Sequence, residues 1–272
     1  MSAGTDRPTG TGVHGPGRAG IPQGHLRTDR WWLPRLATVV GLLAFVGYAT
    51  WRAFDGTHYY AAPYVSPFYS PCLAANCVSV RGGADWALFG SWWRLSPALL
   101  VLVFPLGFRV TCYYYRKAYY RAFWSSPPAC AVAEPHARYS GETRLPLILQ
   151  NIHRYFFYVA VPFAAILTYD VALGFRDATG AWGHAGLGSF VLLANVALIW
   201  AYTLSCHSCR HILGGRLKHF SKHPMRYRMW RTASRLNARH MQLAWCSLAS
   251  VAMADLYVYL VASGAFADPT LW

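Results

Sequence analysis

The stretch that decides the fold is SFVLLANVALIWAYTL, residues 189–204, which is followed after one residue by CHSCRH, residues 206–211. The first part is an unbroken apolar run that approaches the roughly 20 residues needed to span a bilayer. The second part carries two thiols and two imidazoles, the side chains that bind zinc, haem iron and iron–sulfur clusters. A membrane-spanning helix that ends in metal ligands is therefore the first hypothesis.

The composition of the whole chain points to the same class of protein. Of its 272 residues, 55% are hydrophobic and 13% are charged, whereas soluble domains carry about 25% charged residues. The pattern predicts an all-α integral membrane protein, a bundle of five transmembrane helices. The expected spans are Trp32–Trp51, Leu95–Tyr113, Leu145–Tyr169, Ser189–Leu204 and Leu243–Ala262.

The distribution of charge predicts how the chain crosses the membrane. Residues 210–239 hold nine Lys or Arg and no acid, whereas residues 54–93 hold one basic residue, Arg81. Because basic loops stay in the cytoplasm, we expect a cytoplasmic N-terminus, an exported C-terminus and a multi-pass protein of the cell inner (plasma) membrane. The net charge of +15 then reflects loops beside anionic lipid and not nucleic-acid binding.

Three regions follow from this pattern. Residues 1–30 lack an apolar run and are rich in Gly, Pro, Thr and Arg, which predicts a disordered cytoplasmic tail and no secretory signal. Residues 31–264 form the five-helix membrane domain. Residues 265–272 are an exported C-terminal tail.

The seven cysteines divide by position along the chain. Cys72 and Cys77 lie in the first exported loop, close enough for a small disulfide loop. Cys246, inside the last span, is expected to be a buried apolar side chain. The candidates for metal binding are the four at or near the cytoplasmic face: Cys112, Cys130, Cys206 and Cys209.

Metal-ligand side chains fall at one depth when the spans are aligned by their cytoplasmic ends. The fourth helix is expected to continue through residues 206–211 to a stop at Gly214-Gly215. At about 100° per residue, Cys206 and Cys209 then lie roughly 60° apart on one face. The residues at this depth on separate spans are Cys112, His153, the 206–211 run and His240.

The most economical ligand set combines the two helix-four cysteines with histidines from other spans. We predict a metal centre at Cys206, Cys209, His153 and His240, because two thiolates and two imidazoles are the ligands of a Rieske-type [2Fe–2S] cluster. Cys112 is an alternative to one of these cysteines. His207 and His211 point to another helix face and are kept in reserve.

A quinone pocket is the second predicted site. Tyr115, Arg116 and Tyr119 share a helical face with Cys112 and are candidates to contact a quinone headgroup. The simpler alternative is interfacial anchoring, which tyrosines provide at membrane surfaces. Arg109 and Arg154 are also functional candidates, since ionisable residues at membrane depth usually have a function.

Four segments of the chain carry a resemblance to a known family. They resemble the membrane-anchor (C) subunit of an actinobacterial succinate dehydrogenase (respiratory complex II), of the class with a membrane-embedded Rieske-type cluster. The likeness covers residues 30 to 265. The segments are Phe108–Arg121, Gln150–Tyr155, Cys206–His211 and Gly215–Pro224.

The resemblance implies a role in succinate:quinone oxidoreduction. A flavoprotein subunit would oxidise succinate, and an iron–sulfur subunit would dock on the basic cytoplasmic face. Electrons would then pass through this anchor to menaquinone or ubiquinone. No catalytic residue for succinate is expected in this chain, and oligomerisation of the whole complex stays open.

Two other functions are open at this stage. One is a haem b anchor with His153 and His240 as axial ligands. The single-chain dihaem anchors need four axial histidines over both leaflets, and no intramembrane histidine is expected near the exported side here. The other is a non-redox membrane protein with a structural zinc site.

Overall fold

The computed structural model describes residues 29–74, 92–93, 95–126, 129, 143–145, 147–177, 179–215 and 217–271. The predicted tail at residues 1–30 lies outside these ranges, except for Asp29 and Arg30. Cys77 and Cys130 also lie outside them. Cys72 is disulfide-bonded.

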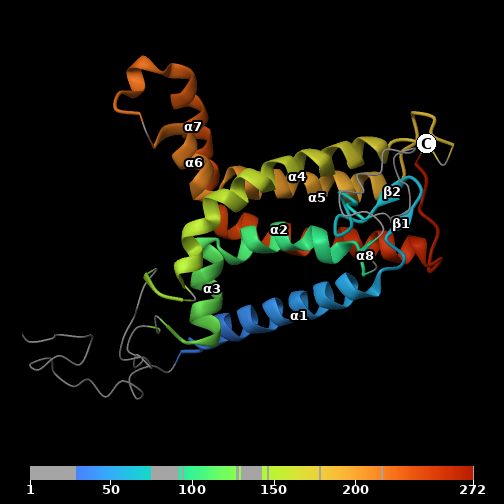
Figure 1. Ribbon diagram of the computed structural model, residues 1–272, viewed down its shortest axis with the longest axis horizontal. Coiled ribbons are helices and arrows are strands. Elements are labelled where there is room, and N and C mark those ends of the chain that lie inside the picture. Colours follow the sequence, from blue (N-terminus) through green and yellow to red (C-terminus); the bar gives the residue numbers. More distant parts are fainter. Residues whose placement is uncertain are drawn as a thin grey trace, which may run out of the picture.

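Four long apolar helices run side by side and form the bundle, as Figure 1 shows: α1 (Leu33–Asp55), α4 (His153–Leu173), α5 (Leu187–Leu204) and α8 (His240–Ala262). A 3-10 helix, η4 (Leu147–Ile152), leads into α4. Each of the four, with η4 counted as part of the α4 span, is long and apolar enough to cross a membrane. The predicted all-α membrane class is therefore confirmed.

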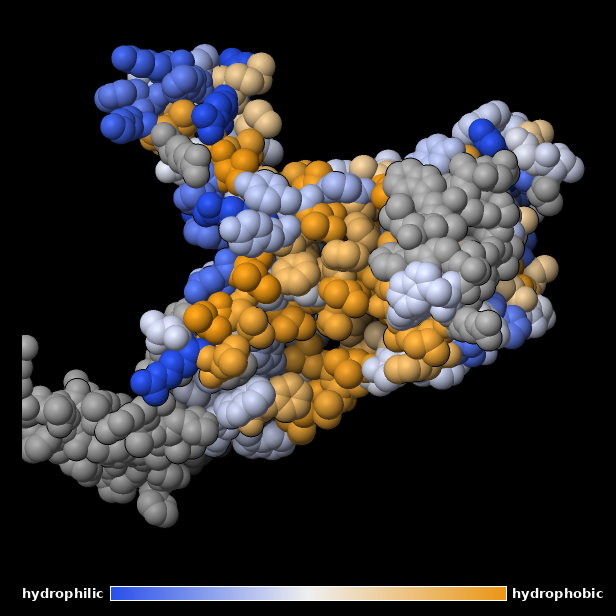
Figure 2. Space-filling model, viewed as in Figure 1, coloured by the Kyte–Doolittle hydropathy of each residue, from blue (hydrophilic) through white to orange (hydrophobic). Residues whose placement is uncertain are grey.

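The fifth span is broken. α2 (Ala98–Val110) and α3 (Tyr113–Phe123) pass the same test only together and meet at an 80° bend. The described residues thus hold four candidate spans, or five if the bent pair counts as one. Figure 2 shows the apolar surface that these helices present, with hydrophilic residues gathered toward its two ends.

The prediction that the fourth helix continues to Gly214-Gly215 is wrong. α5 ends at Leu204, Cys206 is extended (φ −64°, ψ 144°), and a separate helix α6 spans His207–Gly214. The Ser205 hydroxyl donates to the Tyr202 carbonyl at the end of α5. The Cys206 sulfur accepts the Ser208 amide and so caps the new helix.

The junction between α2 and α3 is built in the same way. The Thr111 hydroxyl donates to the Gly107 carbonyl at 2.6 Å, and Cys112 is extended (φ −66°, ψ 131°) before α3 begins. Gly107 lets α4 approach closely, because a Cβ there would lie 2.2 Å from the Phe156 ring. Each junction therefore places a cysteine at the N-cap of a helix that turns away.

The two ends of the bundle differ in structure. We call the end with Cys112 and Cys206 the cysteine end. The opposite end, here the cap end, carries the hairpin of β1 (Tyr60–Ala61) and β2 (Tyr64–Val65) and residues 265–271. There the Asp268 carboxylate accepts from the Tyr64 hydroxyl, so the C-terminal segment is tied to the hairpin.

The expectation that Cys246 is buried is wrong. Its side chain is exposed on α8, where it faces outward from the bundle. An apolar side chain gains nothing from burial when its surroundings are lipid, so hydropathy alone does not place it inside or outside.

Candidate metal centre

Two histidine–cysteine pairs meet at the cysteine end of the bundle. His153 Nε2 lies 3.0 Å from Cys206 Sγ, and His240 Nε2 lies 3.3 Å from Cys112 Sγ. The four side chains come from separate places in the chain, the first residues of α4 and α8 and the two helix junctions. Helix ends that meet in one layer thus create the site.

The bends orient the two cysteines. Cys112 and Cys206 each precede the first residue of a helix, α3 and α6. The N-terminal end of a helix carries partial positive charge, which favours a thiolate over a neutral thiol. If the helix continued straight through either cysteine, the sulfur would not lie at the N-terminal end of a helix.

Hydrogen bonds assign the protons on both imidazoles. His153 Nδ1 lies 2.9 Å from the Thr111 hydroxyl, which already donates to Gly107. His240 Nδ1 lies 2.6 Å from the Ser205 hydroxyl, which already donates to Tyr202. Each hydroxyl must therefore accept from Nδ1–H, so both Nε2 atoms keep a free lone pair that points toward sulfur.

Three of the four side chains of the site are buried, and His240 is half-buried. Cys112 is 3% exposed, His153 5% and Cys206 1%. Burial, and after it the neighbouring Cys112, raises the pKa of the Cys206 thiol, just beyond the end of α5, to about 12. A thiol in such surroundings stays protonated unless a cation binds it.

Three of the four predicted ligands are brought together, and the reserve residue Cys112 joins them. Cys209 is buried in the same apolar cluster, but within the described part of the chain it makes no hydrogen bond to a histidine. His207 is exposed, and His211 Nδ1 lies 3.2 Å from Arg154 Nη2. Among the described residues, no three His, Cys, Asp or Glu side chains converge as a single metal ion requires.

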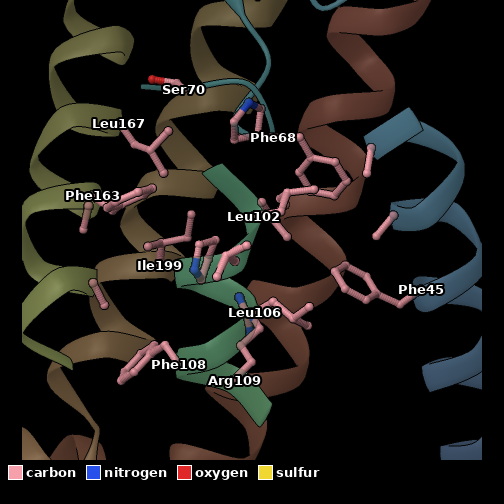
Figure 3. Close-up of a pocket in the computed structure, with 18 of the residues that line it drawn as sticks. Phe45, Phe68, Ser70, Leu102, Leu106, Phe108, Arg109, Phe163, Leu167 and Ile199 are labelled. Atoms are coloured by element: carbon pink, nitrogen blue, oxygen red, sulfur yellow. The ribbon is translucent and has the colours of Figure 1, made fainter. Parts of the chain in front are cut away.

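An apolar cavity of about 390 Å³ extends from the site toward the cap end. Figure 3 shows Phe108 and Arg109 at one end and Ser70 at the other. Arg109 is the only charged residue among the described side chains that line it. The lining residues Val46, Val103 and Leu106 are more than half exposed, so the cavity opens toward the lipid.

Two aromatic rings separate the histidines from this cavity. Phe108 stacks on His153 with ring centroids 4.9 Å apart, and Tyr202 stacks on His240 at 5.1 Å. Both rings line the cavity. The Tyr202 hydroxyl is buried and has no hydrogen-bond partner among the described residues.

The three predicted quinone residues do not line this cavity. Tyr115 is buried, accepts from Arg109 Nη1 at 2.8 Å and donates to the Ala244 carbonyl at 2.7 Å. Tyr119 contacts Gln150, and Arg116 lies over the Tyr113 ring. Tyr115 thus holds Arg109 in place, while the other two lie farther along α3.

Sequence reasoning missed the two hydroxyls and the two rings. Thr111 and Ser205 each directly precede a cysteine of the site, and this repeated hydroxyl–cysteine pair was a signal that could have found them. No pattern in the sequence indicated that Phe108 and Tyr202 would stack on the histidines, because that contact joins residues of different helices.

The fold and the site define a multi-pass helical membrane protein with a buried cysteine–histidine centre at one end. A family model described as actinobacterial succinate dehydrogenase subunit SdhC matches residues 33–264. The chain belongs to this family and is a membrane subunit of succinate dehydrogenase.

Comparison of structures supports the assignment. A chain of the Mycobacterium smegmatis Sdh1 complex in the apo form is 53% identical, with a TM-score of 0.86 over 96% of this chain and 99% of that chain. Among curated proteins, none matches the chain.

Proposed function

We propose that this subunit carries electrons from a docked iron–sulfur subunit, through a Rieske-type [2Fe–2S] cluster, to a quinone in the membrane. The observation that carries this proposal is the pair of imidazoles with Nδ1–H bound to a hydroxyl and Nε2 directed at sulfur. Metal-binding histidines commonly have the second nitrogen held in this way.

The donor set fits a two-iron cluster. His153 and His240 would hold one iron, and two cysteines would hold the other. Cys206 is one of them, and geometry favours Cys112 over the predicted Cys209 as the second, because Cys112 lies against His240. Such a cluster transfers one electron at a time, at a potential that imidazole ligation raises.

The same contacts argue against a haem between the two histidines. A cysteine sulfur stands in front of each Nε2 atom, where an axial ligand would need to face porphyrin iron. Pairwise contacts also differ from the convergent ligands of a structural zinc site.

The cavity suits a quinone that enters from the bilayer. Its apolar walls match an isoprenoid chain, and Arg109 offers N–H donors to a quinone carbonyl at the end nearest the cysteines. The Phe108 and Tyr202 rings would lie between the headgroup and the two histidines. Tyr115 positions Arg109, while Arg116 and Tyr119 remain candidates for a different contact.

A second cavity suits electron entry. It measures about 920 Å³, opens at the cysteine end and is lined by His153, His240 and Arg154 among others. We place this end in the cytoplasm, because the basic residues 210–239 lie there. An iron–sulfur subunit docked over it, next to its flavoprotein partner, would approach both histidines.

Spectroscopy of the purified complex tests the cluster. After reduction we expect an electron paramagnetic resonance signal of a [2Fe–2S] centre with imidazole ligands, together with iron and acid-labile sulfide beyond that of the soluble subunits. A sharp haem α band on reduction would instead establish the haem anchor. Zinc without additional iron or sulfide would establish the structural site.

Substitutions test the ligand set. The double variant His153→Ala/His240→Ala is expected to lose succinate-to-quinone transfer but keep reduction of soluble dyes by the partner subunits. Cys112→Ser should remove the cluster signal, and Cys209→Ser should not. Cys246→Ser, on the exposed face of α8, is the matched control. Quinone reduction that survives in the double variant would refute the proposal.

A further inference from the structure

A helical hairpin projects sideways from the cysteine end. It consists of α6, the 3-10 helix η5 (Phe220–Lys222) and α7 (Pro224–Asn237). Figure 1 shows α7 running across the direction of α1, α4, α5 and α8 and reaching beyond the edge of the bundle. Because the long helices cross the membrane, α7 must lie along the membrane plane near its surface.

Contacts within the hairpin hold α6 and α7 together. The Trp230 ring packs so closely on Gly214 that a Cβ there would lie 2.3 Å from it. Arg226 donates to the Leu213 carbonyl, and Arg210 donates to the Ser234 hydroxyl. Asn237 donates to the Ser205 carbonyl at 2.7 Å and so connects the hairpin to the residue before Cys206.

The remaining surface of α7 is divided by character. Met225 and Met229 are 68% and 48% exposed, and with Leu236 they fall within about 40° of one another around the helix axis. Three arginines fall in an arc about 100° away: Arg228, Arg231 and Arg235. These arginines are exposed, and their side chains make no hydrogen bond or ion pair with another described residue.

The two surfaces face different surroundings. Figure 2 shows hydrophilic residues on the side of the hairpin that points away from the bundle and apolar residues on the side turned toward the membrane-spanning region. An apolar strip beside a basic face is typical of helices that lie in a membrane interface.

We propose that α7 is an interfacial helix that binds anionic phospholipid. Met225, Met229 and Leu236 enter the boundary between headgroups and acyl chains. The three arginines hold lipid phosphates through charge-assisted hydrogen bonds. Residues 210–239 contain no acid, so no carboxylate in the segment competes for them.

The test uses the assembled complex in nanodiscs, with Cys130→Ser and Cys246→Ser as the background. An environment-sensitive fluorophore is attached at Met229→Cys, or at Tyr227→Cys about 160° around the helix as the matched control. We expect lipid-attached quenchers to quench position 229 strongly and position 227 weakly. The contrast should increase in phosphatidylglycerol relative to phosphatidylcholine.

The triple variant Arg228→Gln/Arg231→Gln/Arg235→Gln tests the charges. Its affinity for phosphatidylglycerol, measured by native mass spectrometry of the complex, is expected to fall about tenfold or more, with the other subunits retained. Equal quenching at both positions in both lipids would overturn the proposal. Release of the iron–sulfur subunit with unchanged lipid binding would also overturn it, in favour of a protein-docking surface.

Discussion

At the scale of single residues, two hydroxyl groups determine how the histidines are used. Thr111 and Ser205 each donate to a carbonyl one helical turn or less away and accept from a histidine Nδ1. The same bonds lie at the end of a helix, next to a cysteine. One hydroxyl therefore bonds the last turn of a helix and also fixes the tautomer of a proposed ligand.

Thr111→Val is expected to weaken metal binding through His153. Loss of such a partner commonly lowers metal affinity or activity about 10–100-fold. Iron content and the reduced-cluster signal of the purified complex measure the effect. Thr38→Val is the control, because Thr38 also donates to a carbonyl four residues earlier but lies on exposed α1. Equal iron in both variants would contradict the assigned tautomer.

Tyr202→Phe removes a buried hydroxyl that has no partner among the described residues. Tyr202 lines the proposed quinone cavity, so we expect its hydroxyl to donate to quinone. The variant should raise the KM for quinone by about two- to tenfold, the value of one hydrogen bond, and keep the cluster signal. Steady-state kinetics with a soluble quinone analogue measures this. Tyr158→Phe, at an exposed position on α4, should change nothing; the same result at position 202 would exclude the contact.

At the scale of helices, the bends make the site possible. α2 with α3 and α5 with α6 each break at a cysteine and change direction. The two histidines begin α4 and α8. Four helix starts thus supply the donors. Two of these starts exist only because the α2–α3 and α5–α6 spans are broken.

Gly107→Ala tests the packing of α2 on α4. The added methyl would lie 2.2 Å from the Phe156 ring, and overpacking of this kind destabilises by about 1–3 kcal/mol. The temperature at which the detergent-solubilised complex aggregates should fall. Gly47→Ala, which meets nothing within 4 Å, should leave that temperature unchanged or raise it. Matching behaviour of the two variants would show that α2 does not rely on this close approach.

At the scale of the whole molecule, an ion pair joins the first and last spans. Arg52 Nε lies 2.8 Å from the Asp255 carboxylate, and both side chains are fully buried. Ser66, just after β2, donates to the same carboxylate. The cap end is therefore held by one polar cluster that connects α1, α8 and the hairpin.

Asp255→Leu leaves a buried arginine without its main partner. Breaking a buried pair in this way costs about 3–5 kcal/mol, so the purified complex should lose stability on heating. The double variant Arg52→Met/Asp255→Leu removes both charges and is expected to recover most of the loss. A single variant as stable as the double one would show that Asp55, which also contacts Arg52 at 2.7 Å, is the partner that matters.

The amino-acid sequence by itself determined the membrane class, the approximate spans and the layer of cysteines and histidines. Hydropathy reports burial in lipid over about 20 residues, and ligand chemistry belongs to side-chain types. The breaks after Val110 and Leu204, the pairing of Cys112 with His240 and the outward position of Cys246 were decided only by the tertiary structure. The bends bring distant helix ends together, and the pairing joins residues 128 positions apart, so neither leaves a periodic signal in the chain.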